Sequence, residues 1–282
     1  MKMKLSIITI NYNNAEGLRK TMESVFAQSC KEFEYIVIDG ASTDGSVDVI
    51  KTSAIQAEGL TFTWVSEKDS GIYNAMNKGL KKAHGEYTLM LNSGDYLIDA
   101  HVIERVLPEL HTEDMIQGNL IEDHPNQTIR FRGYGRSDIS FLDVMEASFP
   151  HQAMFIRLDA MEKYGYYDES YKKGSDSYFF FTSLGFGNAT YRYMDIDVTN
   201  FDMHGISSDP KWRQIDKEED ARWYGEHMSE RLLTMCKEAR QTKRLHDTLH
   251  RHKWIWAITC CLLRISEHLT PTKPNVKKEV VK

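Results

Sequence analysis

The first 95 residues alternate between short apolar runs and stretches whose apolar residues recur at helical spacing. The apolar runs are rich in β-branched residues, which is typical of strands buried on both faces of a parallel sheet. These predicted strands cover residues 5–10, 35–39, 60–67 and 86–92. The predicted helices between them cover residues 15–28, 47–53 and 72–83. Because the connections are short, the pattern predicts an α/β fold with a doubly wound, mostly parallel sheet and right-handed crossovers.

The chain becomes less regular after residue 97. A predicted helix at 101–110 is followed by short strand-like pieces such as MIQGNLI and AMFIR, which indicate a mixed half beside the parallel one. We therefore expect one domain over residues 1–208, with halves at 1–97 and 98–208. A charged C-terminal helical appendage follows at 209–270, and a disordered basic tail at 271–282.

Charge and cysteine content exclude several classes of protein. The formal net charge of −6 argues against nucleic-acid binding, which needs a basic face. The four cysteines form no CxxC pair, so neither a zinc site nor a redox motif is indicated. The apolar part of the N-terminus is too short for a signal peptide, and no apolar run is long enough for a membrane span. These features predict a cytoplasmic protein.

The segment 250–269 combines three cations with a short apolar stretch from Trp254 to Leu263. Tryptophans with flanking cations suit a helix that lies in a bilayer interface, which predicts peripheral contact with the inner face of a membrane. The alternative is a helix that packs on the main domain or on a second subunit. The sequence leaves the oligomeric state open.

Polar residues follow all four predicted strands. The strand ends read Asn11-Tyr12, Asp39, Glu67-Lys68-Asp69 and Asn92-Ser93-Gly94-Asp95, and three of the four carry an acid. Ligands of doubly wound sheets bind beyond the carboxyl ends of the strands. We therefore expect these side chains to line one ligand site.

Each candidate in this site has a structural alternative. Asp39 can accept hydrogen bonds from a nucleotide base or ribose, or it can cap the helix after GASTDG, where Asp44 serves equally. Tyr12 can stack on a base, or it is an ordinary buried tyrosine. Asp69 can position sugar hydroxyls, or it caps the helix that starts at Ser70. Asp95 can anchor a divalent cation that bridges two phosphates, or NSGD is a simple turn.

Several segments together resemble the large inverting glycosyltransferase family 2 of GT-A fold. They are SIITINYNNAEGLRKTMESVFAQSCKEFEYIVIDGASTDGS, EKDSGIYNAMNKGLKKAHGEYTLMLNSGD, SFPHQAMFIR and GYYDESYKKGSDSYFF, in order over about residues 4–207. The resemblance implies that residues 1–97 bind a nucleotide-sugar and that residues 98–208 form the acceptor side. It implies that Tyr12, Asp39, Asp69 and Asn92 contact the donor.

The resemblance also implies a metal site and a catalytic base. NSGD lies where the family has its Asp-x-Asp motif, but Asn92 and Gly94 stand where aspartates are common, which leaves Asp95 for Mn²⁺ or Mg²⁺. The base role carries to Asp176 in GSDSYFF, where the usual acidic partner is absent. Asp168 and Glu169 are alternatives for the base, and a helix cap is the alternative role of Asp176.

Two histidines complete the candidate set. His151, in FPHQAMF, precedes a strand and is placed to face the diphosphate or the acceptor. His204, in FDMHGIS, lies where related enzymes have a loop that closes over the donor, and it is a candidate metal ligand. Each has a purely structural role as its alternative.

The predicted function is transfer of a sugar from a nucleotide diphosphate-sugar, by default a UDP-sugar, to a hydroxyl of a glycan or lipid-linked saccharide in cell-surface polysaccharide synthesis. The alternatives are a sugar-1-phosphate nucleotidyltransferase and a non-catalytic nucleotide-sugar or glycan-binding protein of the same fold. This chain has no phosphate loop of the kind that a nucleotidyltransferase needs near its N-terminus. It also has neither the G-x-G-x-x-G motif of a Rossmann dehydrogenase nor the G-K-[ST] motif of a P-loop enzyme.

Overall fold

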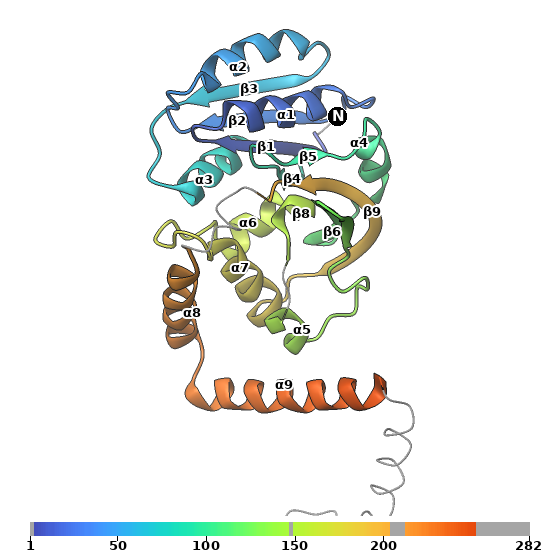
Figure 1. Cartoon of the computed structure of the whole chain (residues 1–282), viewed down its shortest axis with the longest axis vertical. Helices are drawn as coiled ribbons and strands as arrows, with labels where there is room; N and C mark the ends of the chain where they lie inside the picture. Colours follow the sequence, from blue (N-terminus) through green and yellow to red (C-terminus); the bar gives the residue numbers. More distant parts are fainter. Residues whose placement is uncertain (1–2, 147–148, 204–211, 252–282) are drawn as a thin grey trace, which may run out of the picture. The chain divides into compact units, whose positions relative to one another are not determined.

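A computed structural model describes residues 3–146, 149–203 and 212–251. The N-terminal elements are β1 (Leu5–Asn11), α1 (Ala15–Phe26), β2 (Glu34–Asp39), α2 (Ser46–Ser53), β3 (Thr61–Ser66), α3 (Ile72–Lys82) and β4 (Tyr87–Met90). They follow the predicted alternation of strand and helix. Strands β3, β2, β1 and β4 are neighbours in that order, and all their pairings are parallel. Figure 1 shows these strands beside α1, α2 and α3.

Helices cover both faces of this parallel half because its strands are apolar on both sides. Ile7 and Val37 belong to the cluster that packs under α1 and α2. Ile8 faces α3, where a Cβ on Gly79 would lie 2.3 Å from its Cγ2. The missing side chain at Gly79 therefore lets α3 approach the sheet closely. These contacts confirm the predicted doubly wound, mostly parallel sheet.

The second half inserts antiparallel strands into the same sheet. Its elements are β5 (Tyr96–Leu97), α4 (Val102–Val106), β6 (Met115–His124), β7 (Gln127–Phe131), α5 (Phe141–Glu146), β8 (Met154–Arg157), α6 (Leu158–Tyr164), α7 (Ser175–Phe180), β9 (Tyr191–Phe201) and α8 (Arg213–His227). The sheet continues from β4 through β8, β6 and β9 to β5, and β7 pairs with β6. Strand β8 is antiparallel to both β4 and β6, which gives the predicted mixed half.

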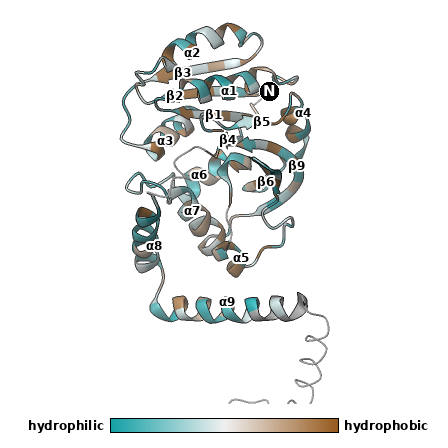
Figure 2. Cartoon of the chain, viewed as in Figure 1, coloured by the Kyte–Doolittle hydropathy of each residue, from teal (hydrophilic) through white to brown (hydrophobic). Residues whose placement is uncertain are grey.

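The chain forms two compact units, Met1–Glu226 and His227–Lys282. In the described part of the second unit, α9 (Glu230–Arg251) is mainly charged and polar, and Figure 2 shows hydrophilic colours over much of its length. Within the described residues, no helix combines the length and apolarity that a membrane crossing needs. The predicted interfacial segment 250–269, apart from residues 250 and 251, and the predicted tail 271–282 lie outside the described residues.

Candidate active site

The carboxyl ends of β1, β2 and β3 meet through one carboxylate. The parallel register places Asn11 beside Asp39, and Asp39 beside Ser66. Asn11 Nδ2 donates to Asp39 Oδ1 at 2.8 Å, and Ser66 Oγ donates to Asp39 Oδ2 at 2.6 Å. The parallel strand ends therefore bring together the polar residues that the sequence placed there.

Asp39 is fully buried and accepts four hydrogen bonds, two of them from the backbone N–H and hydroxyl of Ser42 at 3.0 and 2.6 Å. Burial raises the pKa of Asp39, but the hydrogen bonds from Ser42, Ser66 and Asn11 outweigh burial and leave that pKa below its ordinary value. A carboxylate has about four acceptor positions, so a ligand that contacts Asp39 directly must displace one of these donors.

Asp44 takes the capping role that was the alternative for Asp39. Asp44 Oδ1 accepts from the backbone N–H and hydroxyl of Ser46, the first residue of α2, and Oδ2 accepts from the N–H of Ala15 at the start of α1. One carboxylate thus joins the two helix starts. Asp39 makes no bond to the helix, which leaves its buried charge to organise the strand ends.

Tyr12 and Asp69 both lie close to the position that a side chain of Gly40 would take. A Cβ on Gly40 would lie 2.5 Å from Asp69 Oδ2 and 3.1 Å from the ring of Tyr12. Tyr12 is 66% exposed, so the alternative of an ordinary buried tyrosine is wrong. Asp69 Oδ1 also accepts from the N–H of Gly71, the residue before α3, so Asp69 has part of its alternative capping role.

The loop after β1 joins this cluster to the loop after β4. Asn13 donates its backbone N–H to Ser42 Oγ at 2.8 Å, and Asn14 Nδ2 donates to the carbonyl of Ser93 at 3.1 Å. Thr21 Oγ1 holds the other side of the second loop by donating to the carbonyl of Asp95 at 2.6 Å. The segment from Asn11 to Asn14 therefore lies between the loops that carry Asp39 and Asp95.

Asp95 is 3% exposed, and its Oδ1 accepts the backbone N–H of Asp202 at 2.9 Å. Burial raises the pKa of Asp95 to about 7, against the smaller lowering effects of that N–H and of His151. The carboxylate of Asp202 lies beside the same loop, since a Cβ on Gly94 would be 2.4 Å from Asp202 Oδ2. The site thus contains a second acid that the sequence did not single out.

The carboxylates of Asp95 and Asp202 suit a divalent cation whose other ligands are substrate phosphates and water. In the described part of the chain, no three His, Cys, Asp or Glu side chains are grouped as a metal cage. Magnesium is nevertheless commonly held by one or two carboxylates together with substrate phosphates and water. Asp95 and Asp202 supply that number of carboxylates, while the candidate ligand His204 lies outside the described residues.

Asp176, His151 and Asn92 form a continuous hydrogen-bonded chain. His151 Nδ1 lies 2.9 Å from Asp176 Oδ2, and Asn92 Nδ2 lies 3.0 Å from His151 Nε2. With Asn92 as donor to Nε2, the imidazole carries its proton on Nδ1 and donates it to Asp176. These hydrogen bonds link Asp176 to the loop of Asp95. They bring together three candidate residues that lie far apart in the sequence.

The environment of Asp176 favours its charged form. Its side chain is 17% exposed, and Tyr73 Oη donates to its other oxygen, Oδ1, at 2.8 Å. Burial raises the pKa of Asp176, but the hydrogen bonds from His151 and from the hydroxyl of Tyr73 outweigh burial and keep that pKa below its ordinary value. A carboxylate that is ionised and reachable from solvent can accept a proton.

Helix α8 holds the loop that precedes Asp176. Glu219 Oε1 accepts the backbone N–H of Lys172 at 2.5 Å, and Oε2 accepts those of Lys173 and Gly174 at 3.1 and 2.9 Å. We call this set of three bonds the Glu219 clasp. Helix α7 begins at Ser175 directly after it, with Gly174 as its N-cap, so Asp176 is not the cap.

The two alternative bases have structural partners. Glu169 accepts from Asn74 and Asn77 of α3, at 2.8 and 2.9 Å. Asp168 Oδ1 accepts the N–H of Ser170 at 2.8 Å, which closes a local turn. Of these three acids, only Asp176 is hydrogen-bonded to His151 and through it to Asn92 in the loop of Asp95.

The comparisons with known proteins agree with this fold. The sequence profile of Glycosyl transferase family 2 matches residues 6–166. A PGL/p-HBAD biosynthesis glycosyltransferase of Mycobacterium bovis (strain BCG / Pasteur 1173P2) is 30% identical over 203 residues, which cover 71% of this chain and 77% of the relative. The chain therefore belongs to glycosyl transferase family 2, and it is a glycosyltransferase.

Two solved structures share the fold. S. aureus TarS 1-349 in complex with UDP-GlcNAc superposes with a TM-score of 0.58 at 19% identity, over 71% of this chain and 58% of TarS 1-349. The mannosyltransferase PcManGT from Pyrobaculum calidifontis, in complex with GDP-Man and Mn²⁺, gives a TM-score of 0.62 at 17% identity, over 80% of this chain and 64% of PcManGT. This chain thus spans about three fifths of each, and both likenesses support a GT-A-type fold.

Proposed function

We propose that this glycosyltransferase inverts the anomeric centre of a nucleotide diphosphate-sugar, by default a UDP-sugar, and transfers the sugar to a hydroxyl of a glycan or lipid-linked saccharide. The observation that carries the proposal is the chain from Asp176 through His151 to Asn92, because it links a proton acceptor to the loop proposed to hold the diphosphate. A role in cell-surface polysaccharide synthesis is part of the same proposal. The Mycobacterium bovis relative supports this role, because it is named a PGL/p-HBAD biosynthesis glycosyltransferase.

The nucleotide lies against the ends of β1, β2 and β3 in this proposal. The exposed ring of Tyr12 stacks on the base, and Asp69 accepts hydrogen bonds from donor hydroxyls. Asp39 acts through the serine hydroxyls that it holds, or it exchanges one of them for a ribose hydroxyl. Asn11 Oδ1 is buried without a hydrogen-bond partner among the described residues, so a ligand that donates to it removes an energetic cost.

The diphosphate lies at the loop of Asp95. Asp95 and Asp202, joined in the proposal by His204, would hold Mn²⁺ or Mg²⁺ against the phosphates. Such a cation neutralises the negative charge that develops on the leaving diphosphate. Asn92 lies in the same loop and has its own buried Oδ1 without a partner among the described residues, which suits a donor hydroxyl.

The transfer step needs one proton acceptor. The acceptor oxygen forms a bond to the anomeric carbon while the bond from that carbon to the diphosphate breaks, and the acceptor proton moves to the Asp176 carboxylate. Inversion follows because attack occurs opposite the leaving group with no covalent enzyme intermediate, as in inverting hydrolases. His151 and Tyr73 hold the two carboxylate oxygens in place and keep them charged beforehand.

The test replaces the base without changing its shape. Asp176→Asn should bind UDP and Mn²⁺ like the parent in calorimetry, while release of UDP from a UDP-sugar, with or without acceptor, falls roughly 10²–10⁴-fold. Asp168→Asn, in the same half of the chain, is the matched control and should keep the parental rate. Parental turnover in Asp176→Asn would refute the assignment of the base.

A further inference from the structure

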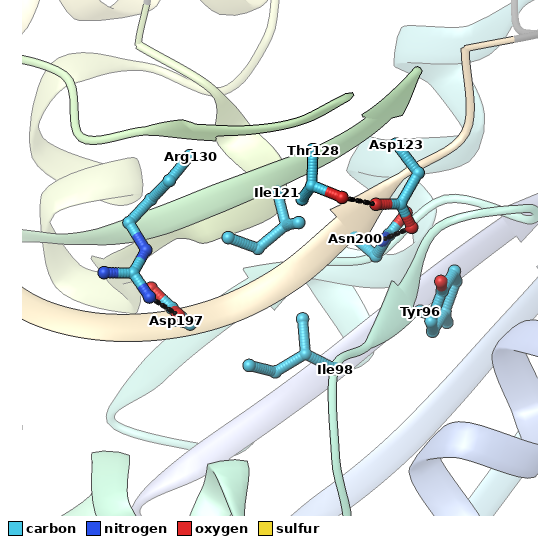
Figure 3. Close-up of a pocket in the computed structure, with 8 residues that line it drawn as sticks. All are labelled: Tyr96, Ile98, Ile121, Asp123, Thr128, Arg130, Asp197 and Asn200. Atoms are coloured by element: carbon cyan, nitrogen blue, oxygen red, sulfur yellow. Dashed lines mark hydrogen bonds and ion pairs between the residues drawn. The ribbon is translucent and has the colours of Figure 1, made fainter. Parts of the chain in front are cut away.

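A pocket lies among the strands of the mixed half, apart from the residues of the proposed active site. Its volume is about 530 Å³, which is within the roughly 300–1,000 Å³ of small-molecule sites. Its walls come from β5, β6, β7 and β9, and Figure 3 shows its lining side chains. The lining residues are Tyr96, Ile98, Ile121, Asp123, Thr128, Arg130, Asp197 and Asn200.

The polar side chains of the pocket are held by one another. Asp123 accepts from Thr128 Oγ1 at 2.8 Å and from Asn200 Nδ2 at 2.6 Å. Arg130 donates to Asp197 at 2.5 Å at the opposite end, as Figure 3 shows. These pairs fix the side chains before any ligand arrives, which lowers the entropy cost of binding.

Hydrogen-bonding capacity remains after these pairs are made. Among the residues that the structure describes, the Tyr96 hydroxyl has no hydrogen-bond partner, and Asn200 uses only its Nδ2. Arg130 has five N–H donors and spends one on Asp197. The pocket therefore offers both donors and acceptors to a ligand, as a hydroxyl group requires.

The middle of the pocket is apolar. Ile98 and Ile121 lie between the two polar ends, and the ring of Tyr96 stands at the side of Asp123 (Figure 3). One face of that ring is covered, since Lys20 Nζ of α1 lies 3.9 Å from its centroid. An apolar centre with a polar rim matches a ring that has C–H groups on its faces and hydroxyls around its edge.

The charges around the pocket cancel. Asp123 and Asp197 bring two negative charges, while Arg130 and the nearby Lys20 bring two positive ones. A phosphate group would meet carboxylates at both ends of the pocket, and a divalent cation would meet a guanidinium. A neutral ligand rich in hydroxyl groups avoids both conflicts.

Two paired strands connect the pocket to the loop of Asp95. Tyr96 directly follows Asp95 and pairs with Asn200 across β5 and β9. Two residues after Asn200, the N–H of Asp202 binds Asp95 Oδ1. A ligand in the pocket is thus held on the strands that also fix the proposed metal ligands.

We propose that this pocket is a second saccharide-binding site, which holds a neutral hexose unit of the acceptor or product glycan. The inference rests on the proposed function for its source of saccharide. The pocket itself takes no part in the transfer step. Its role is to retain the glycan on the enzyme beside the reacting end.

The test uses neutral methyl glycosides of glucose, galactose, mannose and N-acetylglucosamine as probes. Saturation-transfer NMR on the full chain, with UDP and Mn²⁺ in excess to fill the donor site, should give a binding signal for at least one glycoside. That signal should fall to background in Arg130→Ala and in Thr128→Val. Ile129→Ala is the matched control, because Ile129 lies between them on β7 and points to the other face of the strand.

Three outcomes overturn the inference. The first is the absence of a saturation-transfer signal for all of the glycosides, and the second is a signal that survives in both pocket variants. The third is a signal that UDP abolishes in the parent, which would place the sugar in the donor site. The proposed function fails on different readings, namely absence of UDP binding or an active Asp176→Asn variant. A failure of one can therefore be told from a failure of the other.

Discussion

Two aspartates in the proposed active site, Asp95 buried and Asp176 partly buried, have opposite electrostatic environments. Asp95 receives the backbone N–H of Asp202 and a side-chain hydrogen bond from Gln152, but burial dominates and raises its pKa to about 7. Asp176 receives the His151 imidazole and the Tyr73 hydroxyl, which leave its pKa below the ordinary value in spite of burial. Acids whose pKa values are pushed apart in one site commonly have different roles. Here the charged one suits a proton acceptor, and the other would be ionised by the cation that it is proposed to bind.

Removing the imidazole should change the pH dependence of the reaction. His151→Ala takes away the main group that lowers the pKa of Asp176, so that pKa rises and the acid limb of kcat/KM for donor hydrolysis moves to higher pH. His151→Asn should move it less, because its amide can still donate near the position of Nδ1. His101→Ala, in the exposed group with Glu104, should leave the profile unchanged. An acid limb that stays in place in His151→Ala would contradict the argument.

Asp95 should make the metal-free protein less stable as pH rises. Its folded-state pKa of about 7 lies above the ordinary value of 3.8, so the folded state binds more protons between those values. The free energy of unfolding in EDTA should therefore fall from about pH 4 to about pH 7 and then level off. Asp95→Asn should flatten this slope, while Asp48→Asn on α2 should not. Denaturant unfolding across the pH range measures both, and an equal slope in Asp95→Asn would exclude this cause.

At the scale of elements, the sequence predicted the strand ends well and the contacts across the site poorly. Asp39 and Asn11 meet because both end parallel strands, which apolar runs reveal. Asp202 and Tyr73 were missed, since their partners Asp95 and Asp176 lie 107 and 103 residues away. Those contacts depend on where β5 and β9 pair and on how α7 lies against α3, and no local pattern encodes either. Tyr73 was inside a quoted motif, but its hydroxyl had no predicted partner.

Gly94 tests the link between the loop and β9. Its φ of +109° disfavours any side chain, and an added Cβ would meet Asp202 Oδ2. Gly94→Ala should therefore lower stability by about 1–3 kcal/mol and weaken Mn²⁺-dependent UDP binding. Gly59→Ala is the matched control, with a φ of +77° and nothing within 4 Å of its Cβ, so it should lose stability and keep the binding. Calorimetry with and without Mn²⁺ separates the effects, and unchanged metal dependence in Gly94→Ala would argue against Asp202.

At the scale of the whole chain, the first compact unit ends with a helix that supports the proposed base. Trp223 of α8 stacks on Tyr178 of α7, with ring centroids 5.4 Å apart and planes 8° from parallel. The Glu219 clasp holds the loop that leads into α7. Both contacts lie beyond residue 166, where the match to the family profile ends. The predicted domain boundary at residue 208 stays a prediction. The first compact unit of the structure runs to Glu226.

Glu219→Ala should make the position of Asp176 less well fixed and leave donor binding unchanged. Three backbone N–H groups lose their acceptor, so stability should fall by about 1–3 kcal/mol and kcat for donor hydrolysis should fall with it. The Kd for UDP should stay at the parental value, because the ends of β1, β2 and β3 are untouched. Glu218→Ala, whose partner is Gln214 in the same helix, is the matched control. Parental kcat in Glu219→Ala would show that the clasp does not position the base.

The clasp also sets an order for the completion of the site during synthesis. The three amides emerge from the ribosome 45 to 47 residues ahead of the carboxylate that fastens them. A nascent chain that ends before α8 already contains every strand end proposed to hold the nucleotide, yet the loop before its proposed base still lacks the Glu219 clasp. The nucleotide site should therefore be complete before the loop of the proposed base is fixed as the polypeptide grows.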